Sequence, residues 1–256
     1  MKEINAVKYF AGAALAVAIS SAAVAEPTRG FSIEHGTIAE KGAVSVDLNN
    51  NLNGTSAGVR AGFGKFEFVL NSGHVGGNQG PSFDADDLGG FLDPDDIDDL
   101  GDFGDMQGTD AIVKVALPSL EGLSELKHSW AVFGGLSMYD DEVSKYTNIS
   151  AGLAFTAEID ALSFTVTPTL VIDDTIDKTY LNIGMGAYFD LGETAYGSFK
   201  PGAEVIISTL SDADTVLNLG VRWGLNERVN LDLVPLQFGG QDVLSLPGQI
   251  RLNAAF

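Results

Sequence analysis

The stretch that decides the fold is TYLNIGMGAYF, residues 179–189. Apolar and small or polar residues alternate along it without a break. Because successive side chains of a β-strand point to opposite faces, this alternation predicts a strand with one apolar face. The apolar face holds Leu181, Ile183, Met185, Ala187 and Phe189, and the other face holds Tyr180, Asn182, Gly184, Gly186 and Tyr188.

Segments with the same alternation recur from Ala43 to the end of the chain, separated by clusters of Asp, Asn, Gly and Ser. Segments of about ten such residues are typical of a transmembrane β-barrel, whose outer face meets lipid. The sequence therefore predicts an all-β, antiparallel transmembrane barrel of about twelve strands, an even number; ten and fourteen are the alternatives. The twelve segments lie near residues 43–49, 56–63, 65–73, 109–117, 128–139, 146–159, 162–172, 178–189, 195–207, 214–225, 229–238 and 248–256.

The connections alternate between short and long, as strands that run back and forth across a membrane require. The short ones are expected on the periplasmic side, although the connection 118–127 is long for such a turn. Three prolines interrupt strands and call for bulges or strand ends there: Pro168, Pro201 and Pro235. The short connections are Gly64, 160–161, 190–194 and 226–228, and the long or acidic ones are 140–142, 173–177, 211–214 and the segment after Gly73.

The N-terminus has the features of a cleaved signal peptide over residues 1–25. Lys2 and Lys8 precede an apolar run at residues 10–19, and Ala23-Val24-Ala25 is a small-x-small processing site. We expect residues 26–42 to form a periplasmic lead-in and residues 43–256 to form the barrel.

Composition narrows the function. The chain has no Cys and a formal net charge of −21; without Lys2, Glu3 and Lys8, 12 basic and 34 acidic side chains remain, a charge of −22. So acidic a protein is a poor ligand for nucleic acid. The mature chain has no run of 18 apolar residues, so it can cross a membrane only as a closed barrel.

The C-terminus ends in Phe256, preceded in alternation by Ala254, Leu252 and Ile250. This resembles the last strand of Gram-negative outer-membrane β-barrel proteins, and no motif identifies a narrower family. The resemblance implies a location in the bacterial outer membrane, contact with its lipid and lipopolysaccharide, and recognition of Phe256 by the barrel assembly machinery.

A soluble secreted β-sandwich would show the same alternation. The predicted lipid face, however, carries no Asp, Glu, Lys or Arg in any of the twelve segments. An Arg or Lys there would cost about 2–4 kcal/mol at mid-bilayer, and a sandwich has no such restriction. The absence of charge on this face therefore favours a barrel in lipid.

The opposite face collects five basic and five acidic residues, which we predict to line the pore. Rings of one charge make a pore selective, and this set is balanced. Two interpretations stay open: a mildly selective pore, or a network of paired charges that fills the barrel, because strand number alone does not decide between them. The ten residues are Asp47, Arg60, Glu67, Lys114, Glu158, Lys200, Glu204, Arg222, Asp232 and Arg251.

The segment 74–108 is expected to be a long acidic extracellular loop without Lys or Arg. It is interpreted as a mobile solvated loop, as a loop folded into the mouth that narrows it and attracts cations, or as a place where Ca²⁺ binds loosely. Its spacing does not match an EF-hand, and no other cofactor or metal is predicted. Its ten aspartates are Asp84, Asp86, Asp87, Asp93, Asp95, Asp96, Asp98, Asp99, Asp102 and Asp105.

Catalytic signals are weak. The pattern of an outer-membrane phospholipase is twelve strands with a His-x-Ser pair at the outer rim. This chain has Ser72-Gly73-His74, which is the reversed order. His35 and His128 lie away from the acidic residues of the mouth, so a protease of this class is not indicated either. We predict no enzyme.

The sequence favours a small porin-like channel for passive diffusion of hydrophilic solutes, weakly cation-preferring. The alternative is a closed barrel that acts through its acidic extracellular loops. The oligomeric state stays open.

Overall fold

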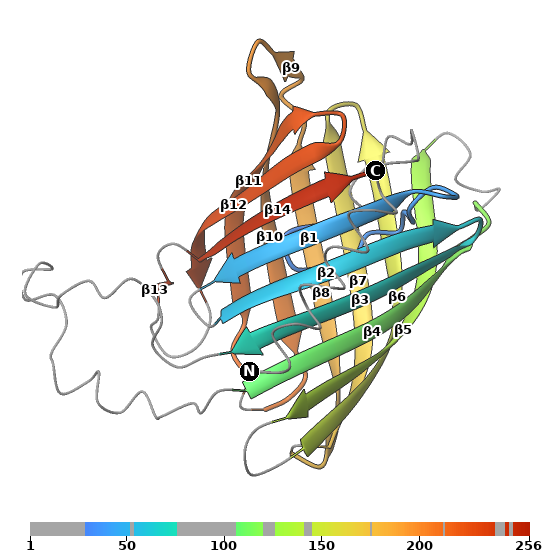
Figure 1. Cartoon of the computed structure of the whole chain (residues 1–256), viewed down its shortest axis with the longest axis vertical. Helices are drawn as coiled ribbons and strands as arrows, with labels where there is room; N and C mark the ends of the chain where they lie inside the picture. Colours follow the sequence, from blue (N-terminus) through green and yellow to red (C-terminus); the bar gives the residue numbers. More distant parts are fainter. Residues whose placement is uncertain are drawn as a thin grey trace, which may run out of the picture.

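The structure is a computed structural model that describes residues 29–51, 54–75, 106–119, 126–140, 145–174, 176–211, 213–238, 244–245 and 248–256. Its strands form one antiparallel sheet that closes on itself, because the last strand pairs with the first (Figure 1). The predicted signal peptide, residues 1–25, lies outside the described residues. No helix of the described part of the chain is long and apolar enough to span a membrane.

The described residues form fourteen strands, and two of these contain two residues each, β9 (Glu193–Thr194) and β13 (Leu244–Ser245). The remaining twelve make the wall, which confirms the predicted strand number. In order around the barrel they are β1 (Val44–Asn51), β2 (Gly54–Phe63), β3 (Phe66–Val75), β4 (Met106–Leu117), β5 (Lys127–Asp140), β6 (Lys145–Ile159), β7 (Leu162–Asp173), β8 (Lys178–Phe189), β10 (Gly197–Ser208), β11 (Val216–Asn226), β12 (Val229–Phe238) and β14 (Gln249–Ala255).

The outer face is apolar, as the alternation predicts. On β7, for example, Val166 is 41% and Leu170 47% exposed, while Thr165 and Thr167 on either side of Val166 point inward and are buried. Exposed apolar side chains along whole strands are stable only where the surrounding medium is itself apolar. The outer face of this barrel therefore fits hydrocarbon.

One end of the barrel has short turns, and we call it the turn end; the other is the loop end. The turn end includes Gly64 and Asp160, whose positive φ values of 70° and 51° belong to tight connections. Outward aromatic residues gather near it, as in the aromatic belts at membrane–water interfaces. They are Phe63, Phe66, Phe68, Trp130, Phe155, Phe164, Phe189, Phe199 and Trp223.

The prolines sit where the pairing tolerates a missing N–H. Pro235 lies in an irregularity between β11 and β12, where the register shifts between Leu219 and Val221. Pro201 directly precedes Gly202, the first residue of β10 that pairs with β8. The pairing of β6 with β7 is interrupted opposite Pro168. These are the bulges, ends and gaps that the sequence requires.

Residues 29–42 depart from the predicted arrangement. They lie inside the barrel near the turn end and are not a lead-in before it: Phe31 and Ile33 are only 1% and 5% exposed. Their positions are fixed by contacts with inward side chains of many strands, described below. We call residues 29–42 the lumen segment.

A charge on the outer face tests the membrane assignment. Val166→Arg should lower the free energy of unfolding by about 2–4 kcal/mol, because the guanidinium would face hydrocarbon. The measurement is a urea titration of the protein folded into phospholipid vesicles. Thr169→Arg on the opposite face of the same strand is the control and should cost much less, since it faces the lumen. Equal losses would contradict a lipid-facing outer surface.

Candidate functional site

The lumen segment is anchored by two apolar side chains. Phe31 packs edge-on against the ring of Tyr188 at a centroid distance of 5.5 Å and forms a buried cluster with it and Val234. Ile33 lies over Gly184. A Cβ added at Gly184 would stand 2.6 Å from the Cγ2 atom of Ile33. A side chain at position 184 would therefore collide with Ile33. Glycine on the inward face of the wall makes room for the segment.

The wall also binds the main chain of the lumen segment. Glu204 accepts the N–H groups of Phe31 and Ser32 at 2.5 and 2.7 Å, and Arg251 donates to the carbonyl oxygens of Gly30 and Phe31. Four further bonds complete the set, from Arg222 to the Arg29 carbonyl (3.0 Å), from Thr167 to the Glu34 carbonyl (2.7 Å), and from the N–H groups of Gly36 and Ala39 to Thr156 (2.9 Å) and Glu67 (2.6 Å). These contacts come from six strands and hold the segment across the lumen.

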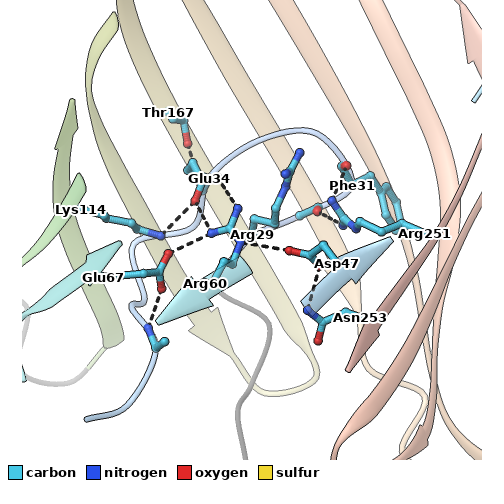
Figure 2. Close-up of polar contacts among 12 residues, drawn as sticks. Arg29, Phe31, Glu34, Asp47, Arg60, Glu67, Lys114, Thr167, Arg251 and Asn253 are labelled. Carbon is cyan, nitrogen blue, oxygen red and sulfur yellow. Dashed lines mark hydrogen bonds and ion pairs between the residues drawn. The ribbon is translucent and has the colours of Figure 1, made fainter. Parts of the chain in front are cut away.

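Glu34 is the charged centre of one cluster (Figure 2). Its carboxylate pairs with Arg60 at 2.9 Å and with Lys114 at 3.3 Å. Arg60 also binds Asp47 at 3.3 Å and Glu67 at 2.9 Å, so three carboxylates surround one guanidinium. Buried charges are stable only when they are paired and hydrogen-bonded. Glu34, which is not part of a strand, therefore helps to stabilise the buried cations of the wall.

A second cluster lies on neighbouring strands of the wall. Asp232 accepts from Arg222 at 2.6 and 2.9 Å and also pairs with Arg251. The register places Asp232 opposite Arg222 on one side and opposite Arg251 on the other. Because Arg222 and Arg251 also donate to the lumen segment, this cluster joins the wall to the segment.

Of the ten residues predicted to line the pore, eight lie inside the barrel and are 9% exposed or less. The other two lie nearer the turn end in exposed pairs: Glu158 with Lys127 at 2.5 Å, and Lys200 with Asp190 at 2.9 Å. With Arg29 and Glu34 of the segment, the buried level holds five basic and five acidic side chains. The buried eight are Asp47, Arg60, Glu67, Lys114, Glu204, Arg222, Asp232 and Arg251.

The loop half of the lumen differs from this packed level. Its described inward side chains are mostly polar and half-buried, and they include three tyrosines, Tyr139, Tyr146 and Tyr180, beside shorter residues. We call it the vestibule, and its wall includes two carboxylates, Asp110 and Asp173, on strands β4 and β7. Tyr180 donates to Asp173 at 3.3 Å. The uncharged polar residues of the vestibule wall include Ser56, Asn71, Ser137, Asn148, Ser150, Thr169 and Asn182.

Several predicted features lie outside the described residues: the ten aspartates of the loop 74–108 and the side chain of His74. Ser72 is described and points outward, exposed. In the described part of the chain, no group of three or more His, Asp or Glu side chains is placed to hold a metal ion. The backbone of Phe256 pairs with Val44, which puts the chain end on the seam between β14 and β1; its role as an assembly signal stays a prediction.

The lumen segment is the functional feature that the sequence did not reveal. The alternation starts at Ala43, and a further strand within residues 26–42 would break the even strand number, so the sequence predicts no strand there. A usable signal lies in the wall, where glycine occupies inward positions 184, 186 and 220 close together in the folded barrel. Such positions leave a space that some other part of the chain has to fill.

Removal of the shared carboxylate tests the energetics of the packed level. Asp232→Asn should lower the free energy of unfolding by about 3–5 kcal/mol, because two buried guanidinium groups lose their anion. Asp190→Asn is the matched control; its pair with Lys200 is about two-fifths exposed and is worth at most about 1 kcal/mol. Urea titration in vesicles measures both, and similar losses for the two variants would refute the assignment of Asp232 to a buried network.

No protein-family profile and no curated relative matches the chain. Among solved structures it is similar to the KdgM porin in complex with disordered oligogalacturonate, with a TM-score of 0.48 and 9% identity over 83% of this chain and 96% of that one. It is also similar to a bacterial polysaccharide outer membrane secretin (TM-score 0.41, 10% identity, 84% and 98% covered) and to CdiB from Escherichia coli (TM-score 0.39, 12% identity, 91% and 67% covered). These values identify no family. With its closed twelve-strand wall and apolar exterior, the chain has the architecture of a single-chain, porin-like outer-membrane β-barrel.

Proposed function

We propose that this protein is an outer-membrane channel for passive diffusion of small hydrophilic solutes, and that the lumen segment closes the channel. The observation that carries the proposal is the division of the lumen into a half-buried, largely polar vestibule and a packed level that the wall does not fill by itself. A barrel built to be solid would fill its lumen with side chains of the wall alone, as small filled barrels do; here residues 29–39 take part in the filling.

The charged side chains of the packed level are buried in the arrangement described here. Glu67 and Lys114 are 0% exposed and Arg251 is 2% exposed, so water does not reach them. A water-filled pore would expose such side chains. Solutes would therefore pass when the lumen segment moves. The connection between the segment and β1 supports such a movement, because Glu40, Lys41 and Gly42 are exposed and Gly42 has a φ of 87°.

A weak preference for cations is part of the proposal. The packed level is balanced between five basic and five acidic groups, so it favours neither sign. The vestibule wall carries Asp110 and Asp173, with Lys178 opposite Asp173 at the rim, and the chain as a whole has a net charge of −21. Carboxylates that line a narrow entrance raise the local concentration of cations. The path needs no reaction, and we propose no catalytic role.

The packed level also keeps the alternative open. A barrel whose lumen segment never leaves would be closed and would act through its loops. The two functions differ in one property, conductance. Deletion of residues 26–38 separates them: a variant that folds, shown by heat-modifiable migration in gels, and that still carries no current would favour the closed barrel.

A reversible disulfide tests the channel and its closure. The chain contains no Cys, and a Cβ added at Gly184 would stand 3.3 Å from the Cβ of Ile33, near the separation of about 3.5–4.5 Å found in disulfides. Planar-bilayer recordings of Ile33→Cys/Gly184→Cys should show long closed periods when the protein is oxidised. Reduction should restore the opening of the unmodified protein. The two single variants are controls, and a current that is the same before and after reduction would argue against closure by this segment.

Charge in the vestibule can be tested separately. Asp110→Asn/Asp173→Asn should shift the reversal potential under a salt gradient toward zero, because the entrance loses two negative charges, while single-channel conductance persists. Asp214→Asn, which removes one negative charge from an exposed connection between strands, should leave the reversal potential close to that of the original protein. An unchanged reversal potential in the double variant would mean that other groups set the selectivity.

A further inference from the structure

The lumen segment is bound in the way a protein binds a peptide ligand. Within the described residues 29–42 the only β-bridge joins two residues of the segment itself, Arg29 and Glu34. The N–H of Gly30 donates to the carbonyl of Ile33 at 2.8 Å, so residues 29–34 form a bent loop with its own hydrogen bond. The loop is held by side chains of the wall and is not a strand of the sheet.

Most hydrogen bonds between the wall and the lumen segment are made to the main chain of the segment. Eight hydrogen bonds join six wall side chains to backbone atoms of residues 29–39, from Glu204, Arg251, Arg222, Thr167, Thr156 and Glu67. Bonds to the main chain do not depend on which side chains the ligand carries. The wall is therefore equipped to bind a peptide loop as such.

Three positions add selectivity. The Phe31 ring enters a recess beside Tyr188 and over Gly220, and Ile33 enters the space left by Gly184. Glu34 reaches Arg60 and Lys114. The recesses and cations together fit two apolar residues at i and i+2 followed by an acidic residue at i+3.

We propose that the packed level of the lumen is a peptide-binding site, which the chain's own residues 29–39 occupy, and that it binds a separate peptide of the pattern apolar-x-apolar-acidic when the tethered segment is released. The ligand class is a short bent peptide loop with a buried carboxylate. The proposal concerns binding alone, so it stands or falls without reference to conductance.

The test uses the complete mature chain, so that folding takes place with the segment present. A specific protease site is inserted between Lys41 and Gly42, which are exposed, and the folded protein is cut in detergent. The probe is a fluorescent synthetic peptide with the sequence of residues 29–39. We expect the cut segment to remain bound after cleavage and to exchange with the probe, giving a saturable rise in fluorescence anisotropy that unlabelled peptide reverses.

Specificity is tested on both partners. A Glu34→Gln peptide should bind about 10- to 100-fold more weakly, the size expected for loss of a hydrogen bond to charged groups. Gly184→Ala in the barrel should also weaken binding, because the new methyl occupies the place of Ile33, while Gly135→Ala in the vestibule should not. A scrambled peptide that binds equally well, or a cut segment that excess peptide never displaces, would overturn the proposal. Binding by a barrel that carries no current would leave this inference standing and count against the channel.

Discussion

The structure depends on one requirement, that no backbone N–H or C=O group be left unpaired in hydrocarbon. An open sheet has two edges, and this chain removes them by pairing β14 with β1 over seven consecutive residue pairs, from Ser45 with Ala255 to Asn51 with Gln249. Once the sheet is closed, its two faces meet different media. The outer face has to be apolar, and every charged side chain of the strands has to point inward or lie at an end. The alternation along the sequence and the crowding of charge in the lumen are two results of the same closure.

Charge in the lumen creates the second problem, because desolvated ions need partners. The wall solves part of it across adjacent strands, where Asp232 lies between Arg222 and Arg251. At Arg60 the wall contributes the carboxylates of Asp47 and Glu67. Glu34 completes that set from outside the sheet. The lumen segment therefore contributes to the electrostatics of the barrel as well as to its packing.

Period-2 alternation is a local property, and it predicted the local features well: the twelve strands, the lipid face, and the inward placement of residues such as Glu204 and Arg222. It carries no information on distances across the lumen. Lys114 pairs with a residue 80 positions away, in a segment with no alternation of its own. Of the two interpretations left open for the inward charges, paired charges describe the packed level. A mildly selective pore stays a prediction.

The place of the lumen segment also bears on how the molecule comes together. The segment continues directly into β1 at Val44, and the seam with β14 joins the first and last strands of the chain. A ring that closes last at this seam closes around its own beginning. Residues 29–42 have to wait in the interior while eleven further strands are added, or be threaded through a narrow end afterwards. In the first order of events the segment can serve as a template, since it offers partners to strands from β2 to β14 before those strands have formed a circle. The same residues would then have two roles: a template for the wall during folding, and a part of the lumen in the folded protein.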